Sequence, residues 1–136
     1  MHITIHHSDM TRIFSILLLA LAALTVNAAE PDITFEELTF DFGTIAEDGG
    51  PVKHEFKFTN NGDAPLMIVN ATASCGCTRP DFPKKPVAAG KKGVLKVTYL
   101  PKGRPGEFNK TVTVKTNSKK HKKVTLRIKG FVTPES

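Results

Sequence analysis

The amino-acid sequence predicts an all-β protein, an immunoglobulin-like β-sandwich of about seven strands. Three observations support this prediction. After residue 29, apolar and polar residues alternate with a period of two, as in strands that bury one face. Proline and glycine separate these runs at short intervals, and no segment there carries the apolar stripe of a capped helix. Several short strands in roughly 100 residues are typical of two packed sheets, with a small barrel as the alternative.

The first half of this region supplies three predicted strands or more. Residues Ile33–Phe42 form one strand, or two with a break. In Val52–Thr59, a valine, a histidine and two phenylalanines share one face, while charged and hydroxyl side chains share the other. Asn60–Asp63 then predicts a tight turn, because Asn-Gly supplies the positive φ angles that a hairpin needs. The next strand is Leu66–Ala73.

The second half supplies the remaining strands. Val94–Leu100, Thr111–Lys115 and Val124–Lys129 each alternate apolar residues with lysine, arginine or threonine. Pro80–Pro86 and Pro101–Gly106 are predicted to connect strands, since proline cannot donate a ladder hydrogen bond.

The N-terminus predicts export. The apolar stretch Ile13–Val26 follows Arg12 and is shorter than the roughly 20 residues that span a bilayer. Because it ends in small residues, it is typical of a secretory signal peptide cleaved after Ala28, with a retained signal anchor as the alternative. The predicted division is therefore residues 1–28, an extension and signal peptide, and residues 29–136, one domain. Its expected location is the periplasm or the cell envelope.

The cysteine pair is the most specific candidate site. Cys75 and Cys77 are the only two cysteines, and Gly76 alone separates them. Residues i and i+2 of a strand point to the same side, so the two sulfurs can approach each other. A cross-link over three residues would constrain the unfolded chain by only about 1.6 kcal/mol. Long-range stabilisation therefore does not explain this spacing.

Three interpretations of the pair remain open. The first is a local disulfide, or two packed thiols, that shapes the end of a strand. The second is a redox-active dithiol, because a tight, strained disulfide is more easily reduced and the nearby Arg79, Lys84 and Lys85 favour a thiolate. The third is a Cu(I) site, to which the fold would have to bring Met67, His54 or His121.

Charge is distributed unevenly along the chain. The formal net charge is +6, but residues 29–78 carry two Lys/Arg and nine Asp/Glu, and residues 79–129 carry sixteen Lys/Arg and two Asp/Glu. The densest cluster is a predicted hairpin tip that forms a candidate basic patch: Lys119, Lys120, Lys122 and Lys123. The tip either binds an anionic partner or is a solvated turn that discourages strand pairing. Nucleic acid is not expected, because the N-terminus predicts export and no aromatic residues interleave with the lysines.

Catalytic groups are not evident in the sequence. His54 lies on the apolar face of its strand beside Phe56 and is predicted to pack there. No paired carboxylates or nucleophile motif accompany it, so an enzyme is not predicted and no cofactor is expected.

Several segments occur in an order that resembles a known family: Phe40–Ile45, His54–Gly62, Pro65–Ile68, Ser74–Pro80, Gly106–Lys110 and Ile128–Gly130. They resemble the bacterial domain of unknown function 1573 family, in which Ser-Cys-Gly-Cys-Thr is the most specific element. The resemblance implies an exported immunoglobulin-like domain of the Hydin-like type and brings no assigned activity.

The sequence therefore predicts an exported, non-catalytic binding or scaffolding domain of the bacterial cell envelope. The expected partner is an envelope protein or an anionic glycan or lipid surface, with no transmembrane segment left after signal cleavage. The alternative is a thiol-redox or copper-handling protein that acts through Cys75-Gly76-Cys77.

Overall fold

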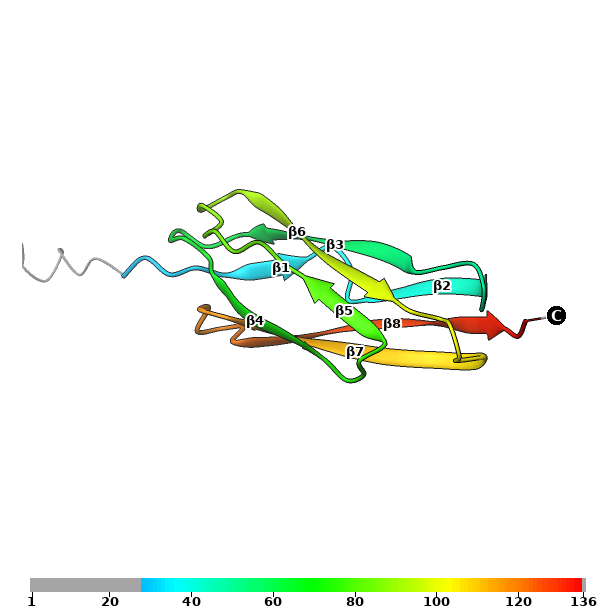
Figure 1. Ribbon diagram of the computed structural model, residues 1–136. Helices are drawn as coiled ribbons and strands as arrows, with labels where there is room; N and C mark the ends of the chain where they lie inside the picture. Colours follow the sequence, from blue (N-terminus) through cyan, green and yellow to red (C-terminus); the bar gives the residue numbers. More distant parts are fainter. Residues whose placement is uncertain (1–27, 136) are drawn as a thin grey trace, which may run out of the picture.

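Two four-stranded sheets face each other in the computed structural model, which describes residues 28–135 (Figure 1). The predicted signal peptide lies outside the described residues, apart from Ala28. The strands are β1 (Ile33–Phe35), β2 (Thr39–Ala46), β3 (Val52–Asn60), β4 (Ile68–Ala73), β5 (Thr78–Asp81), β6 (Lys92–Tyr99), β7 (Gly106–Thr116) and β8 (Lys123–Thr133). The predicted all-β sandwich is confirmed, with eight strands rather than about seven.

The strand order explains how the chain builds two layers. The first sheet has the order β1-β3-β6-β5 and the second has the order β2-β8-β7-β4. All pairs are antiparallel except β2 with β8. Of the two alternatives predicted for Ile33–Phe42, the structure has two strands with a break, which sends β1 to one sheet and β2 to the other.

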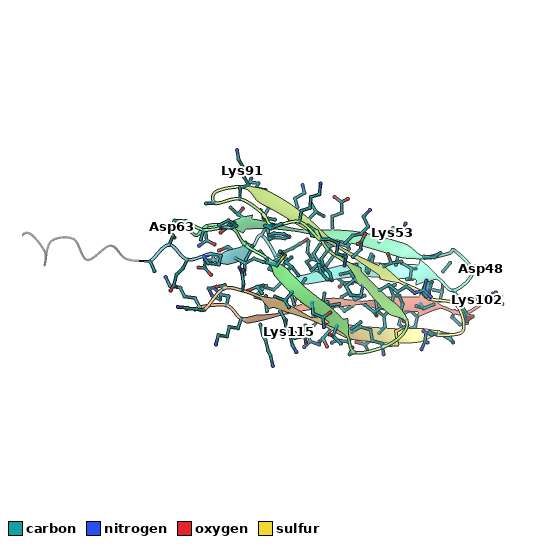
Figure 2. The ribbon with its side chains drawn as sticks, turned by 60° about the vertical axis from the view of Figure 1, so that its left-hand side comes forward. Asp48, Lys53, Asp63, Lys91, Lys102 and Lys115 are labelled. Atoms are coloured by element: carbon teal, nitrogen blue, oxygen red, sulfur yellow. A yellow bond between two sulfur atoms is a disulfide. The ribbon has the colours of Figure 1, made fainter. Side chains whose placement is uncertain are left out.

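The core lies between the sheets and follows the alternation in the sequence. Phe56 and Phe58 of β3 are fully buried, and Tyr99 stacks on Phe108 across the interior with ring centroids 4.0 Å apart. The other buried apolar residues are Ile33, Leu66, Ile68, Cys77, Leu95, Val97, Val112, Val114, Leu126, Ile128 and Val132. Charged side chains such as Lys53, Lys91 and Lys115 project outward from the sandwich (Figure 2).

One predicted connection begins inside a strand. Pro80 lies within β5, where the sequence predicted a loop over Pro80–Pro86. The prediction was wrong because β5 is an edge strand that pairs with β6 alone. Proline is tolerated at an edge, where one side of the strand needs no ladder hydrogen bonds.

The predicted hairpin at Asn60–Asp63 is also wrong. The chain turns there, but β3 and β4 on either side belong to different sheets. Gly62 does not have a positive φ. It is required for close approach instead, because a Cβ at this position would collide with the backbone of residues 30–32.

Asn60 organises this crossover. Its side chain is fully buried and donates hydrogen bonds to the carbonyls of Ala64 (2.8 Å) and Val87 (2.9 Å). The side-chain oxygen of Asn60, Oδ1, accepts hydrogen bonds from the backbone N–H of Gly62 (3.0 Å) and of Asp32 (3.3 Å). A buried amide with all of these partners fixes the path of the chain between the sheets.

Candidate functional site

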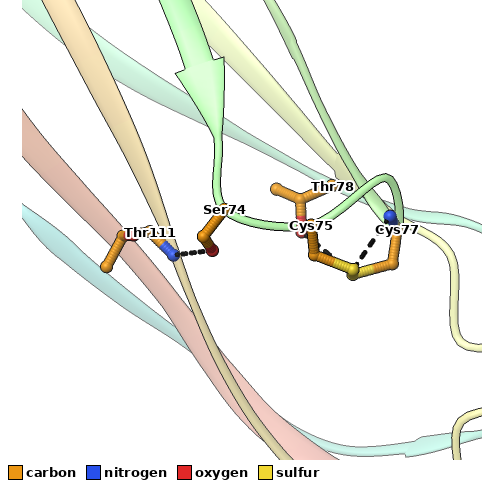
Figure 3. The surroundings of a disulfide bond; sticks show 5 residues. All are labelled: Ser74, Cys75, Cys77, Thr78 and Thr111. Atoms are coloured by element: carbon orange, nitrogen blue, oxygen red, sulfur yellow. Dashed lines mark hydrogen bonds between the residues drawn. A yellow bond between two sulfur atoms is a disulfide. The ribbon is translucent and has the colours of Figure 1, made fainter.

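The cysteine pair lies at the corner where the chain leaves β4 and crosses to β5 in the other sheet (Figure 3). A disulfide joins Cys75 to Cys77, whose Cα atoms are 5.1 Å apart. Cys77 is 1% exposed and belongs to the core, while Cys75 is partly buried against it. The two cysteines therefore differ in their exposure to solvent.

Backbone hydrogen bonds fasten this corner to both sheets. Ser74 donates its N–H to the carbonyl of Thr111 in β7 (3.0 Å) and accepts the Thr111 N–H with its hydroxyl (3.1 Å). The carbonyl of Cys77 accepts the N–H of Leu100, just after β6 (2.9 Å). The residues on either side of the disulfide are thus fixed to different sheets. This arrangement favours a structural role for the disulfide, as part of the corner that joins the two sheets.

Three of the groups that a redox or copper site would use are engaged in other contacts. Lys84, one of the basic residues expected to favour a thiolate, lies over the ring of Phe82 with its Nζ 3.4 Å from the centroid. His54 contacts Glu37, and His121 contacts Asp32. Among residues 28–135, no group of three or more histidine, cysteine or acidic side chains is arranged to hold a metal ion.

A pocket of about 510 Å³ adjoins the cysteine corner. Pro51, Leu100 and Pro101 give it apolar walls, and Lys102 and Arg104 provide cations. Its other lining residues are Glu47, Asp48, Gly50, Gly76, Cys77 and Glu135. Sequence reasoning missed this pocket because distant segments meet to form it, and no motif marks that meeting.

Tyr99 lies in the core near this end of the sandwich. Burial raises the pKa of its hydroxyl, and the charge of Arg104 partly opposes that shift. Tyr99 is therefore neutral at physiological pH.

The basic run at the hairpin tip is divided by the fold. Lys119 forms an ion pair with Glu30 (3.3 Å), and Lys120 lines a pocket together with Glu30 and Asp63. Lys122 and Lys123 lie on the other side of the tip, around the exposed Val69 of β4. The four predicted lysines thus do not form a single patch.

Asp32 holds the tip against the N-terminal segment. Its Oδ1 accepts from the His121 ring (Nδ1, 2.6 Å), the Ser118 hydroxyl (3.0 Å) and the backbone N–H of Ile33 (2.9 Å). Desolvation raises the pKa of Asp32, but these hydrogen bonds outweigh it and leave the pKa below its usual value. The serine, histidine and aspartate do not form a catalytic triad, because both other side chains bond to the carboxylate.

His54 packs as predicted. Its ring stacks on Phe40 with centroids 3.5 Å apart and planes 6° from parallel, and it meets Phe56 edge-on at 4.8 Å. Its Nε2 contacts Glu37 Oε1. These contacts give the imidazole a structural role.

A family model described as "Protein of unknown function (DUF1573)" matches residues 33–132. The chain belongs to this family. A comparison with curated protein sequences finds no match. The DUF1573 assignment confirms the family predicted from the Ser-Cys-Gly-Cys-Thr run and its flanking segments.

Solved structures similar to this DUF1573 domain have immunoglobulin-like folds. A protein of unknown function from Porphyromonas gingivalis has a TM-score of 0.67 and 15% identity over 79% of this chain and 50% of its own. The aligned region is thus half of that protein. The ASH/PapD-like domain 7 of human CEP192 has a TM-score of 0.62 and 14% identity over 100% of both chains. The periplasmic chaperone SfaE has a TM-score of 0.51 and 16% identity over 77% of this chain and 59% of its own.

Proposed function

We propose that this DUF1573 protein is an exported, non-catalytic binding or scaffolding domain of the cell envelope. A periplasmic chaperone is among the proteins that share its fold, and a chaperone works by binding another protein. Within residues 28–135 no helix is long and apolar enough to cross a membrane.

Partner binding by strand addition is disfavoured at all four sheet edges. β1 has only three residues, and the β2 ladder is interrupted between Asp41 and Thr44, where Gly43 has a φ of 68°. β4 contains a register shift, and the Asn70 side chain accepts the N–H of Ala71 there (2.9 Å). β5 has four residues, including Pro80. Such features protect edges from pairing with another chain, so binding would use the sheet faces and loops.

The observation that carries the proposal is the surplus of unpaired cations on the surface. Among the described residues, Lys119 is the one lysine or arginine with a carboxylate within 4.0 Å. Lys53, Lys91 and Lys115 project away from the two sheets (Figure 2). A partner with complementary negative charge would gain attraction from side chains that lose no internal ion pair.

A capture experiment tests the proposal. Residues 29–136, immobilised through a C-terminal tag, should retain specific envelope components that elute when the ionic strength is raised. A second immobilised sandwich of similar net charge serves as the control. Recovery of the same components on both columns, or of none, would contradict the proposal.

A further inference from the structure

The outer side of the second sheet joins cations to hydroxyl groups near the hairpin. Lys115 of β7 lies opposite Lys123 of β8, and the next outward-facing pair is Thr113 with Thr125. The following pair places Thr111 opposite Arg127. On the neighbouring strand β4, Asn70 lies opposite Lys115 and Thr72 lies opposite Thr113, so each of the first two pairs becomes a row of three side chains across the sheet. We call these side chains, together with Lys122, the cation–hydroxyl face.

Carboxylates are absent from this face among the described residues. The acidic side chains of the same sheet surface lie in later rows, where Asp41 is opposite Lys129 and Glu107 is opposite Phe131. Lys115, Lys122 and Lys123 together line a shallow depression around Val69. The positive charge here is therefore not neutralised by its neighbours.

We propose that the cation–hydroxyl face binds an acidic polysaccharide, which names the ligand class of the binding domain proposed above. Ammonium and guanidinium groups bind the anionic groups of such a polymer. Threonine hydroxyls and the Asn70 amide can both donate and accept hydrogen bonds, and so match the hydroxyl groups of sugar rings.

The spacing of the charges fits a polymer. Lys123 and Arg127 are four residues apart along β8, or about 14 Å at the rise of a strand. The row of Thr72, Thr113 and Thr125 lies between them. A polysaccharide could place one anionic group at Lys123 and another at Arg127, with the sugar hydroxyls between them at the threonine row.

An anionic membrane fits the same face less well. Helices that bind the membrane interface insert a broad face of large apolar side chains. Here Val69, 62% exposed, is the one large apolar residue beside the three lysines of the depression. The threonine hydroxyls of this face would find no hydrogen-bond partners among lipid acyl chains.

The test uses residues 29–136 with polygalacturonate as the probe, its fully methyl-esterified form as the uncharged ligand, and phosphatidylglycerol vesicles as the lipid alternative. The face variant carries Lys115→Gln, Lys122→Gln, Lys123→Gln and Arg127→Gln. A matched control variant removes four charges from the first sheet and its adjoining turn: Lys53→Gln, Lys57→Gln, Lys91→Gln and Lys92→Gln. Thermal melts establish that both variants fold.

The expected result is polygalacturonate binding that weakens with salt, falls roughly thirtyfold in the face variant and changes less than about threefold in the control. Thr113→Val with Thr125→Val retains the β-branched shape and every charge, and should weaken binding by about threefold or more. That loss would show that the hydroxyls contribute beyond net charge.

Four outcomes would overturn the inference: no binding of polygalacturonate, equal binding of its methyl ester, equal loss in both charge variants, or tighter binding of vesicles. The capture experiment distinguishes failure of the polysaccharide proposal from failure of the proposed binding function. If envelope components are still retained specifically while polygalacturonate is not bound, the ligand class is wrong and the binding domain stands. If both fail, the proposed function fails too.

Discussion

Alanine substitution at the two cysteines should have unequal effects on stability. Cys75→Ala and Cys77→Ala both remove the cross-link, which the loop-entropy relation values at about 1.6 kcal/mol. Cys77 is 1% exposed and packs in the core, whereas Cys75 is partly buried. Cys77→Ala therefore also removes core packing worth about 1 kcal/mol.

The expected losses in unfolding free energy are about 1.6 kcal/mol for Cys75→Ala and about 2.6 kcal/mol for Cys77→Ala. Reduction of the wild-type disulfide removes the cross-link and leaves both thiols packed, so it should cost about as much as Cys75→Ala. The gap of about 1 kcal/mol between the variants corresponds to roughly 4–8 °C in Tm for a domain of this size.

Urea unfolding of residues 29–136, oxidised and reduced, measures these differences, and alkylation followed by mass measurement reports the thiol state. Equal effects of the two substitutions would contradict the assigned burial. If neither substitution nor reduction changed stability by more than about 0.5 kcal/mol, the structural role would be refuted and the redox interpretation favoured.

Three further predictions concern the crossover and the hairpin clasp. Asn60→Ala should cost about 3 kcal/mol in urea unfolding, because it removes the buried side-chain partner of four backbone groups. The neighbour variant Asn61→Ala, which loses only exposed hydrogen bonds to Thr34 and Asp32, should cost under about 1 kcal/mol; similar costs would refute the role of Asn60. Gly62→Ala should cost about 2 kcal/mol through collision with the neighbouring backbone, and an unchanged Tm would contradict that close approach. The folded pKa of Asp32 is lowered, so its stabilisation is present above the unfolded-state pKa and lost as the pH falls through the folded value. The wild type should therefore be more stable than Asp32→Asn at neutral pH, and this difference in unfolding free energy should shrink on acidification. A difference that stayed constant down to acidic pH would show that the contact with His121 does not depend on the charge of Asp32.

The strands that could be predicted are those with long alternation. Val52–Thr59, Val94–Leu100 and Val124–Lys129 correspond to β3, β6 and β8, because a period of two is a property of the strand itself. β5 could not be predicted, since its four residues include a proline that is acceptable only at an edge. Which strand becomes an edge is a property of the sheet.

The hairpin predicted at Asn60–Asp63 was also wrong because of contacts that the local sequence does not reveal. Asn-Gly in Asn60–Asp63 is typical of a hairpin, but the asparagine serves the crossover through its buried amide and the glycine serves it through its missing Cβ. Both functions depend on segments that approach only in the folded protein: the Asn60 side chain bonds to Val87 and Asp32, and Gly62 meets the backbone of residues 30–32.

The sequence by itself determined the all-β class, the family and the candidate cysteine pair, because alternation and a local motif need no knowledge of distant contacts. The tertiary structure decided which sheet each strand joins, which cysteine is buried, and how the lysine run is divided. Lys119 meets Glu30, while Lys122 and Lys123 join Lys115 beside the threonine rows. These outcomes depend on which surfaces meet when the two sheets pack, and a linear chain carries no local signal for that.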